Sequence, residues 1–493
     1  MSSKSVLQPP IRFGTDGWRG LIADDFTFAR LGKVAPLAAL ALADTFGTYF
    51  ETAQDAVSKT IIIGYDRRFL SPEFAQFIAK VISEAGFDVQ LSEVFAPTPA
   101  FSWAAYSQKA LGALVITASH NPAGYNGLKI KGAFGGSVSP DLTKQVEEKL
   151  DSGFSLPITN TGKITVFDPW ASYCEVLRSL VDIQAIQKMI MSGELTVFAD
   201  PMYGAAASGL ARILEVPIQE INSKSDPTFG GYAPEPLPRN ISALFRKVRG
   251  FHHNHPDKLA VGFVFDGDGD RIAAVDSKGD FLSSQILIPI LIEHLAKNRG
   301  FSGEVIKTIS GLNLIPKVAA LYNLPVYETP IGYKYIAERM LSGVAKPLLG
   351  GEESGGIGYG THIPERDALL SALYLLEAIA LSKQDLSAIY ENLQAQTGYV
   401  SHYDRIDKHL PSNEVSQKLL QLLQTEPFTE IDGRKVISIN AVDGFKFELE
   451  DASWLLIRFS GTEPVLRLYC EAATPELVRQ TLAWISDRVN KLS

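Results

Sequence analysis

Three aspartates alternate with glycines in the segment FDGDGDR (265–271). Asp266, Asp268 and Asp270 follow an apolar run, VGFVF, that predicts a buried strand. In an extended or gently turning backbone, alternate residues point to the same side, so the three carboxylates gather there. Crowded carboxylates repel one another unless a hard cation neutralises them, and ligands that are all oxygen suit Mg²⁺ or Ca²⁺. The segment therefore predicts a metal site, with a solvated acidic turn as the alternative.

An EF-hand, which also begins with alternating aspartates, is excluded. It needs glycine at its sixth position and glutamate at its twelfth, where this chain has Arg271 and Ser277. The residues before the aspartates also predict a strand, whereas an EF-hand loop follows a helix.

Ser119 lies in VITASHNPAGYNGLKI (115–130), between an apolar strand and a loop rich in Asn, Gly and Pro. A serine there is usually a turn residue or a helix cap, but it can also be the covalent nucleophile for a phosphoryl group. Lys129, and Arg19 from the glycine-rich segment FGTDGWRG, can balance the charge of that group. No Ser-His-Asp triad is expected, because side chains of neighbours such as Ser119 and His120 point apart in a strand.

Two further glycine-containing segments suit sugar phosphates. GGEESGG (350–356) is not a nucleotide P-loop, because no Lys-Ser or Lys-Thr follows it. Its Glu352 and Ser354 can bind sugar hydroxyls. In RFSGTEP (458–464) Arg458 offers a bidentate fork to phosphate oxygens. Ser460 and Thr462 add hydroxyl groups, and the turn at Gly461 can aim backbone N–H groups at an anion. Either segment alone is more often an ordinary turn.

Composition limits the class of protein. The chain has 493 residues, 46% hydrophobic and 20% charged, which is typical of globular proteins and long enough for several domains. The net charge of −9 argues against a surface for nucleic acid or an anionic membrane. The two cysteines are too few for a disulfide framework. The N-terminal residues hold no apolar signal-peptide core, and the longest apolar stretch (368–381) is too short for a bilayer and predicts a core helix. A soluble cytoplasmic protein is expected.

Strand and helix patterns alternate through most of the chain. A strand is expected at 59–66 and a helix at 71–86, with Ser71 as its cap. Similar units recur at 194–279 and from 304 onward, whereas the last hundred residues predict two strands over 451–472 and an amphipathic helix over 474–492. The expected fold is three related doubly wound α/β domains and a C-terminal α+β domain around a central cleft. The predicted domains are residues 1–165, 166–280, 281–390 and 391–493.

The chain resembles the α-D-phosphohexomutases, the family of phosphoglucomutase and phosphomannomutase. The resemblance rests on GTDGWRG, TASHNP, DGDGDR, GGEESGG and RFSGTEP, which occur in the family's order from residue 14 to 464. It implies four domains around a cleft, a phosphoryl group on Ser119, and one Mg²⁺ bound by that phosphoserine with Asp266, Asp268 and Asp270. Lys129, Arg19 and His120 are the further catalytic candidates. The implied substrate-binding residues are Arg271, Lys334, Glu352, Ser354, Arg458, Ser460, Gly461 and Thr462.

The resemblance implies that hexose phosphates are the small-molecule partners and that glucose 1,6-bisphosphate is the intermediate and activator. The segment GEESGG resembles the glucose-preferring loop of the family, so the predicted reaction interconverts glucose 1-phosphate and glucose 6-phosphate. Many relatives carry His where this chain has Gly356, so Lys129 or His362 is expected to assist proton transfer. The alternatives are a phosphomannomutase, a glucose 1,6-bisphosphate synthase that uses another bisphosphate donor, and a non-catalytic sugar-phosphate sensor. The oligomeric state is not predicted.

Overall fold

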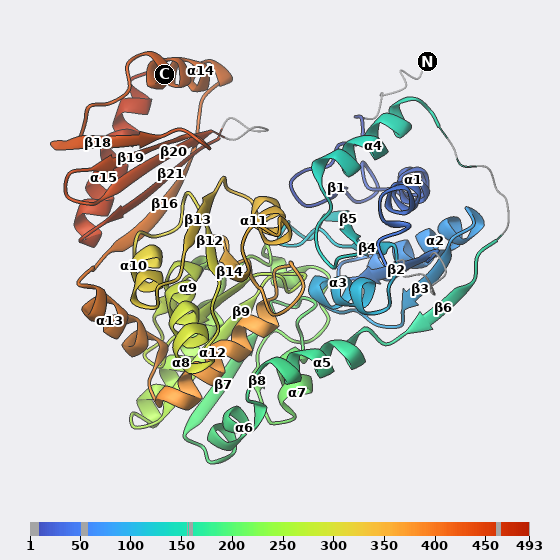
Figure 1. Cartoon of the computed structure of the whole chain (residues 1–493), viewed down its shortest axis with the longest axis horizontal. Coiled ribbons are helices and arrows are strands. Elements are labelled where there is room, and N and C mark those ends of the chain that lie inside the picture. Colours follow the sequence, from blue (N-terminus) through green and yellow to red (C-terminus); the bar gives the residue numbers. More distant parts are fainter. Residues whose placement is uncertain (1–8, 51–57, 155, 157–160, 460–464, 493) are drawn as a thin grey trace.

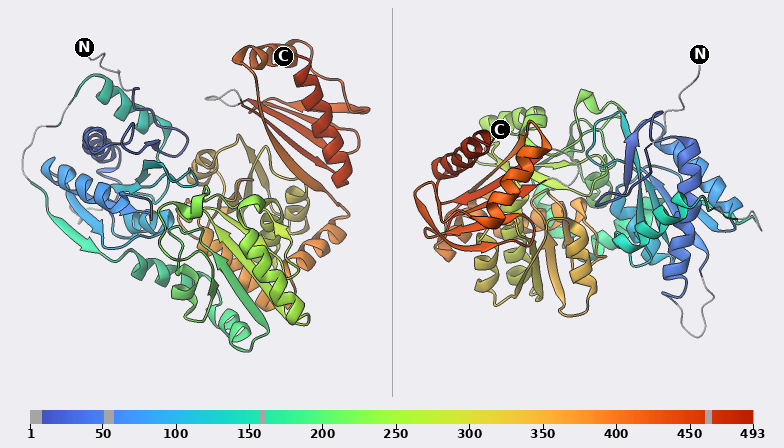
Figure 2. Two further views of the ribbon diagram at one scale, coloured as in Figure 1. Left: turned by 180° about the vertical axis from the view of Figure 1, so that it is seen from behind. Right: turned by 90° about the horizontal axis from the view of Figure 1, so that it is seen from above.

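A computed structural model of the chain describes residues 9–50, 58–154, 156, 161–459 and 465–492. Four sheets follow one another along the chain, and helices pack against each of them (Figure 1). The first and last sheets lie at opposite ends of the molecule, with the two middle sheets between them (Figures 1 and 2).

The first sheet is built by the N-terminal third of the chain. Its strands are β1 (Trp18–Leu21), β2 (Thr60–Tyr65), β3 (Asp88–Ser92), β4 (Gly112–Ile116), β5 (Tyr125–Gly132) and β6 (Ile164–Phe167), and its helices are α1 (Phe28–Phe46), α2 (Ser71–Glu84), α3 (Thr98–Ser107) and α4 (Pro140–Asp151). The strand order is β1-β5-β4-β2-β3-β6. Strands β4, β2, β3 and β6 are parallel, whereas β5 and β1 are antiparallel to their neighbours. The buried β-branched run at the centre of β2 explains why that strand is central.

The second and third sheets repeat this arrangement with fewer strands. The second contains β7 (Leu195–Asp200), β8 (Gln219–Glu220), β9 (Leu259–Phe265), β10 (Ile272–Val275) and β11 (Phe281–Leu282), with α5 (Pro169–Leu180), α6 (Ile183–Met191), α7 (Gly209–Leu214) and α8 (Ser242–Asn254). The third contains β12 (Glu304–Thr308), β13 (Val326–Thr329), β14 (Pro347–Gly351) and β15 (Ile357–Tyr359), with α9 (Ser284–Glu293), α10 (Leu314–Leu321), α11 (Tyr333–Leu341), α12 (Ala368–Ser382) and α13 (Leu386–Thr397). The apolar stretch from the sequence forms α12, whose first thirteen residues are buried, which confirms a core helix.

The fourth sheet is wholly antiparallel, in the order β16-β21-β20-β19-β18-β17. Its elements are β16 (His402–His409), β17 (Glu430–Ile431), β18 (Arg434–Asn440), β19 (Phe445–Leu449), β20 (Trp454–Phe459) and β21 (Val465–Ala472), with α14 (Asn413–Thr425) and α15 (Pro475–Asn490). Thr474 caps α15 by accepting a hydrogen bond from the Leu477 N–H. The predicted fold class, three α/β units followed by an α+β unit, is confirmed. The domain boundaries near 165, 280 and 390 stay predictions.

Each of the first three sheets places one predicted functional segment in the same topological position. The serine loop (117–124) joins β4 to β5, the metal loop (266–271) joins β9 to β10, and the sugar loop (352–356) joins β14 to β15. In every case the first strand belongs to the parallel part of its sheet and the second is antiparallel to it. The carboxyl end of a central strand is where α/β sheets commonly present binding groups.

One helix cap differs from the prediction. Helix α2 begins at Ser71, and its cap is Leu70, which has a left-handed backbone with φ of 61° and no capping side chain. The Ser71 hydroxyl instead donates a hydrogen bond of 2.8 Å to Asp66 Oδ1. Ser71 therefore belongs to a buried polar network behind the serine loop.

Candidate active site

Ser119 occupies a strained turn at the end of β4. Its φ of 52° lies in the left-handed region, which residues other than glycine rarely adopt. Thr117 Oγ1 accepts a hydrogen bond of 2.9 Å from the Ser119 N–H and donates one of 2.6 Å to Asp66 Oδ2. Ser119 itself is only 1% exposed. Such strain persists only where the surrounding contacts enforce it, and it is common at functional sites.

Arg68 enforces the path of the serine loop. Its buried guanidinium donates to four backbone carbonyl oxygens, at distances of 2.6 to 3.1 Å, in Ser119, Asn121, Pro122 and Tyr125. Asp66 lies 3.3 Å from Arg68 Nε and balances its charge. Sequence reasoning missed both residues. The sequence feature that could have identified them is their position in GYDRR, immediately after a strand. Side chains there lie beside the ends of the neighbouring strands.

The expected orientation of His120 is wrong. The Ser119 Oγ and His120 Nδ1 atoms lie 3.2 Å apart. The two residues lie in a turn, and the left-handed backbone of Ser119 brings adjacent side chains together where a strand would separate them. The charge of Arg271, burial and the charge of Arg19 hold the pKa of His120 well below its ordinary value, so its imidazole is neutral near pH 7.

The three aspartates of the metal loop lie beside Ser119. One carboxylate oxygen from each of Asp266, Asp268 and Asp270 falls within 4.8 Å of the others, and all three residues are buried. The Ser119 hydroxyl donates a 3.0 Å hydrogen bond to Asp266 Oδ2. Burial and the charges of Asp270 and Asp268 raise the pKa of Asp266 well above its ordinary value. The loop thus gathers the carboxylates that the alternating spacing predicted.

The donor set fits a hard cation. Asp268 Oδ1 and Asp270 Oδ1 are buried and have no hydrogen-bond partner among the described residues. Buried carboxylate oxygens without partners carry a large desolvation cost, which a bound cation removes. Together with Asp266 they present only oxygen ligands, as Mg²⁺ or Ca²⁺ requires.

Lys129 joins the metal loop to the N-terminal loop. Its ammonium lies 2.6 Å from Asp16 Oδ2, 2.8 Å from Asp268 Oδ2 and 2.8 Å from Asp270 Oδ2. Burial lowers the pKa of Lys129, but the three carboxylates outweigh it and raise the pKa above its ordinary value. Lys129 is therefore held in its charged form by three carboxylates, and its expected roles beside a phosphoryl group and in proton transfer stay predictions. Asp16, its partner, was not predicted.

Arg19 and Arg271 approach the site from different elements, because Arg19 lies on strand β1 and Arg271 ends the metal loop. Arg19 is half-buried and donates a hydrogen bond of 2.7 Å to Asn121 Oδ1 in the serine loop. Arg271 Nε lies 3.9 Å from Asp270 Oδ1, and the Arg271 backbone forms a β-bridge with Gly356 of the sugar loop. The metal and sugar loops are therefore directly attached to each other.

In the sugar loop, Glu352 is buried near the site, and burial raises the pKa of its carboxyl group. Ser354 follows in the same turn, which closes by a 3.2 Å bond from Gly355 N–H to Glu352 C=O. Glu353 turns away, because Ser310 and Thr308 donate hydrogen bonds of 2.6 and 3.2 Å to its carboxylate. The two adjacent glutamates thus have different environments.

Arg366 is a further residue that sequence reasoning missed. It lies between β15 and α12, and its buried guanidinium donates to Asp270 Oδ2 at 2.7 Å, Asp16 Oδ2 at 2.5 Å and Glu352 Oε1 at 3.4 Å. A Cβ atom at Gly356 would lie 2.2 Å from Arg366 Cδ, so this arginine occupies the space of any side chain at 356. His362 lies in the same connection but stacks on Trp103 of α3, with ring centroids 5.3 Å apart.

The predicted phosphate-binding residues belong to the last two units. Arg458, on β20, lies with Nε 3.0 Å from Asp443 Oδ1. Lys334 lies in the first turn of α11, with its ammonium 4.8 Å from the centroid of the Tyr335 ring. These contacts place both side chains among residues of their own units rather than in the serine or metal loop. The predictions for Ser460, Gly461 and Thr462 fall outside the described residues.

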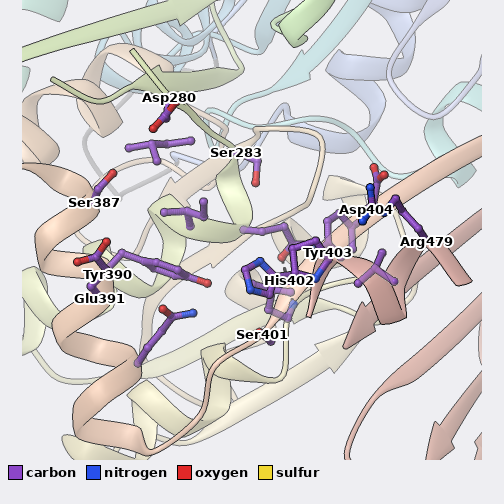
Figure 3. A pocket seen from close by; sticks show the side chains of 17 residues that line it. Asp280, Ser283, Ser387, Tyr390, Glu391, Ser401, His402, Tyr403, Asp404 and Arg479 are labelled. Atoms are coloured by element: carbon purple, nitrogen blue, oxygen red, sulfur yellow. Dashed lines mark hydrogen bonds between the residues drawn. The ribbon is translucent and has the colours of Figure 1, made fainter. Parts of the chain in front are cut away.

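A cavity of about 700 Å³ lies apart from these loops, between α13, the start of β16 and the start of α15 (Figure 3). Tyr390 and Glu391 line one wall, and His402, Tyr403 and Arg479 line another. None of its lining residues is a predicted site residue. No helix among the described residues is long and apolar enough to span a membrane. The cytoplasmic location stays a prediction.

Comparison with known families agrees with this geometry. Models of phosphoglucomutase/phosphomannomutase domains match successive segments: alpha/beta/alpha domain I over residues 10–156, domain II over 171–279, domain III over 283–397 and the C-terminal domain over 419–487. The chain belongs to the phosphoglucomutase/phosphomannomutase family. Members of this family are phosphohexomutases, enzymes that transfer phosphate within a hexose phosphate. The family resemblance and the enzyme class expected from the sequence are confirmed.

Individual phosphohexomutases match over nearly the whole chain. A phosphoglucomutase/phosphomannomutase of Thermococcus kodakarensis is 27% identical, covering 95% of this chain and 96% of its own. A phosphoglucosamine mutase of Limosilactobacillus reuteri is 28% identical, covering 96% and 97%. The crystal structure of a Thermus thermophilus protein named as a putative phosphomannomutase is 31% identical, with a TM-score of 0.81, and covers 98% of this chain and 100% of that one. The names of these relatives differ in the sugar.

Proposed function

We propose that this phosphohexomutase is a phosphoglucomutase that interconverts glucose 1-phosphate and glucose 6-phosphate through a phosphoserine at Ser119 and glucose 1,6-bisphosphate. The observation that carries the proposal is the 3.0 Å contact between Ser119 Oγ and Asp266 within a buried group of three carboxylates. A hydroxyl beside a site for a hard cation is suited to carry a phosphoryl group, since such transfer relies on positioning and charge stabilisation.

The proposed cycle has two transfers. In the first, O6 of glucose 1-phosphate attacks the phosphorus on Ser119 and the P–Oγ bond breaks. The O6 proton passes to a base, and Oγ takes up a proton as it leaves. In the second, Oγ attacks the 1-phosphoryl group of the turned bisphosphate and the O1–P bond breaks, while Oγ gives its proton to the base and O1 takes one up. His120 is the proposed base, because its imidazole is neutral and its Nδ1 lies 3.2 Å from Oγ. Lys129 and Arg19 supply positive charge to the same region.

Asp266, Asp268 and Asp270 are the residues that would hold Mg²⁺, one per chain. When bound, Mg²⁺ neutralises the developing charge of the transferring phosphoryl group. All three carboxylates are buried in the metal loop. Arg366 and Lys129 hold Asp270 Oδ2, and Thr98 Oγ1 donates to Asp268 Oδ2 at 2.6 Å. The ligand oxygens therefore have defined orientations before any substrate arrives.

Sugar and phosphate recognition are assigned to separate loops. Glu352 and Ser354 are the proposed hydroxyl contacts, and Arg458 with Lys334 and Arg271 are proposed to bind the phosphate that is not transferred. This division suits an intermediate that must bind in two orientations, because either phosphate can then meet the same basic residues. Glucose is proposed as the sugar because the GEESGG segment resembles the glucose-preferring loop of the family.

The test is a coupled assay on glucose 1-phosphate, mannose 1-phosphate and glucosamine 1-phosphate, with Mg²⁺ and glucose 1,6-bisphosphate present and bisphosphate products measured alongside. The expected result is fastest turnover of glucose 1-phosphate with little net bisphosphate. Faster turnover of another sugar would overturn the choice of glucose. Net accumulation of bisphosphate would indicate a synthase, and binding without turnover would indicate a sensor.

A further inference from the structure

Asp443 connects the predicted phosphate-binding arginine to the third unit. It lies in the turn between β18 and β19. Its Oδ1 atom accepts a hydrogen bond of 3.0 Å from Arg458 Nε, and its Oδ2 atom accepts one of 2.9 Å from the Ile331 N–H. Ile331 lies just before α11, three residues from Lys334. One carboxylate thus holds two segments that are proposed to bind substrate phosphate.

The neighbouring glycine allows this turn to lie close to β20. Gly444 has a φ of 86°, in the left-handed region. A Cβ atom there would lie 2.4 Å from the Ile457 carbonyl oxygen and 3.0 Å from Arg458 Cα. The turn is therefore packed against the backbone of Arg458 itself, and this close approach fixes where the Asp443 carboxylate stands.

Arg458 has another arginine beside it and therefore needs a negatively charged partner. Arg458 pairs directly with Arg467 across β20 and β21, and like charges in directly opposed positions repel. Arg467 Nε is buried and has no hydrogen-bond partner among the described residues. Arg405 on β16 is already paired with Asp407 at 2.6 Å. Asp443 therefore compensates an arginine that stands beside another arginine.

The contact with Asp443 leaves the two terminal nitrogens of Arg458 available to a ligand. Asp443 engages Nε, and bidentate recognition of phosphate can use the two terminal nitrogens, which form a planar fork. We propose that Asp443 is a positioning residue: it orients the fork of Arg458 toward the substrate phosphate and links it to the Ile331–Lys334 segment. The proposal rests on the phosphate-binding role proposed above for Arg458.

Substitution of Asp443 distinguishes two roles of its side chain: positioning Arg458, or only adding a negative charge next to it. Asp443 is an anion beside a phosphate-binding cation, so if it acted only by charge, its loss would strengthen phosphate binding. If it positions Arg458, its loss weakens binding because the arginine and the Ile331–Lys334 segment become less ordered. The two possibilities have opposite signs, and the affinity for glucose 1-phosphate distinguishes them.

Calorimetric titration of the purified enzyme with glucose 1-phosphate, after a chelator has removed metal, provides this measurement without turnover, because the proposed transfer depends on Mg²⁺. Asp443→Ala is expected to bind on the order of tenfold more weakly than the wild type. Asp443→Asn, which keeps one acceptor oxygen, is expected to lie between the two. Steady-state kinetics should show a raised KM with kcat changed much less, because the contact is distant from the serine loop. Equal or tighter binding by Asp443→Ala would overturn the proposal.

A double-mutant cycle with Arg458→Ala tests whether Asp443 acts through the arginine. In the Arg458→Ala background, Asp443→Ala should weaken binding less than it does in the wild type, because only the order of the Ile331–Lys334 segment is then left to lose. Fully additive losses would contradict the proposal. If the single variant Arg458→Ala binds glucose 1-phosphate as the wild type does, the proposed phosphate-binding role of Arg458 is wrong. The positioning role of Asp443, which rests on it, is then wrong too. If only Asp443→Ala is without effect, the Arg458 assignment stands and the positioning role fails.

The matched control is Asp451→Ala, which removes another aspartate–arginine pair of the same unit, with Arg434 Nη1 at 3.3 Å. It should leave glucose 1-phosphate affinity unchanged. Thermal unfolding checks that each variant is folded. If Asp443→Ala does not fold, Asp443→Asn alone decides, because it preserves shape and must still weaken binding.

Discussion

A Cβ atom at Gly267 would lie 2.3 Å from the carbonyl oxygen of Ser119 and 2.9 Å from Pro234 Cγ. The metal loop therefore approaches the serine loop more closely than any side chain at this position permits. The Gly267 N–H also donates a hydrogen bond of 3.2 Å to the Pro234 carbonyl, which holds the loop in place. The distance between Ser119 Oγ and the aspartates depends on this glycine.

Gly267→Ala should lower turnover by about a hundredfold, because a displacement of roughly 1 Å at a reacting group can have that effect. Initial rates on glucose 1-phosphate measure it. The matched control is Gly250→Ala in α8, where nothing lies within 4 Å of the added Cβ. That variant should keep full activity and gain about 1 kcal/mol of stability from helix propensity. Equal activity of the two variants would contradict the importance of the loop contact.

Ser119 should carry phosphate in part of the purified protein. The motivation is its burial beside three carboxylates that can hold a cation, with Lys129 close by. Intact-mass measurement and peptide mapping, before and after incubation with glucose 1,6-bisphosphate, provide the check, with Ser119→Ala as the control that should gain none. The covalent mechanism is wrong if the peptide that contains Ser119 never acquires phosphate.

Asp268→Asn should lower turnover by more than about a hundredfold while the protein stays folded. The amide keeps an oxygen that can accept from Lys129 Nζ and Thr98 Oγ1, at 2.8 and 2.6 Å from Oδ2 in the native residue, but it loses the charge that attracts a cation. Isothermal titration with Mg²⁺ should show weaker binding, and removal of metal by a chelator should inactivate the wild type reversibly. Unchanged Mg²⁺ affinity in a folded variant would refute the metal assignment.

The sequence predicted the three metal aspartates, Ser119 and Lys129 because each lies in a short segment whose local pattern carries the information. It did not predict Arg366 or Asp16, which bond to each other across 350 positions. Asp16 lies in the GTDGWRG segment, but nothing in that segment indicates a partner so distant in the sequence. Only the docking of the β15–α12 connection against the first sheet brings them together. The predicted orientation of His120 was wrong for a local reason. The prediction assumed a strand at Ser119, whose backbone is in fact left-handed.

The connection between β15 and α12 contains two buried groups, His362 and Asp367, whose pKa values shift in opposite directions. His362 Nε2 lies 3.7 Å from Asp367 Oδ2. Burial lowers the pKa of His362 from 6.5 to about 3, and burial also raises the pKa of Asp367 from 3.8 to about 7. Between about pH 4 and pH 6.5, the unfolded chain therefore binds a proton on the histidine, whereas the folded chain binds one on the aspartate.

These two contributions to stability should offset each other. The contribution of His362 is present above pH 6.5 and lost as pH falls, whereas that of Asp367 is present below about pH 4 and lost as pH rises toward 7. Each has a slope of about 1.4 kcal/mol per pH unit, but the signs are opposite, so the pair binds no net proton on folding in this window. The wild type should show little pH dependence from this pair.

Single substitutions should expose the two slopes. His362→Phe keeps a ring to stack on Trp103, and Asp367→Asn keeps an oxygen that can accept from Tyr173 Oη and the Leu370 N–H. Urea unfolding from about pH 4.5 to about pH 6.5 gives the free energy of each variant relative to the wild type. As pH falls, His362→Phe should become relatively more stable and Asp367→Asn relatively less stable, each by about 1.4 kcal/mol per unit. Parallel curves for all three proteins would show that neither group changes its proton on folding, because a buried histidine that stayed charged and an aspartate that stayed ionised would contribute no slope.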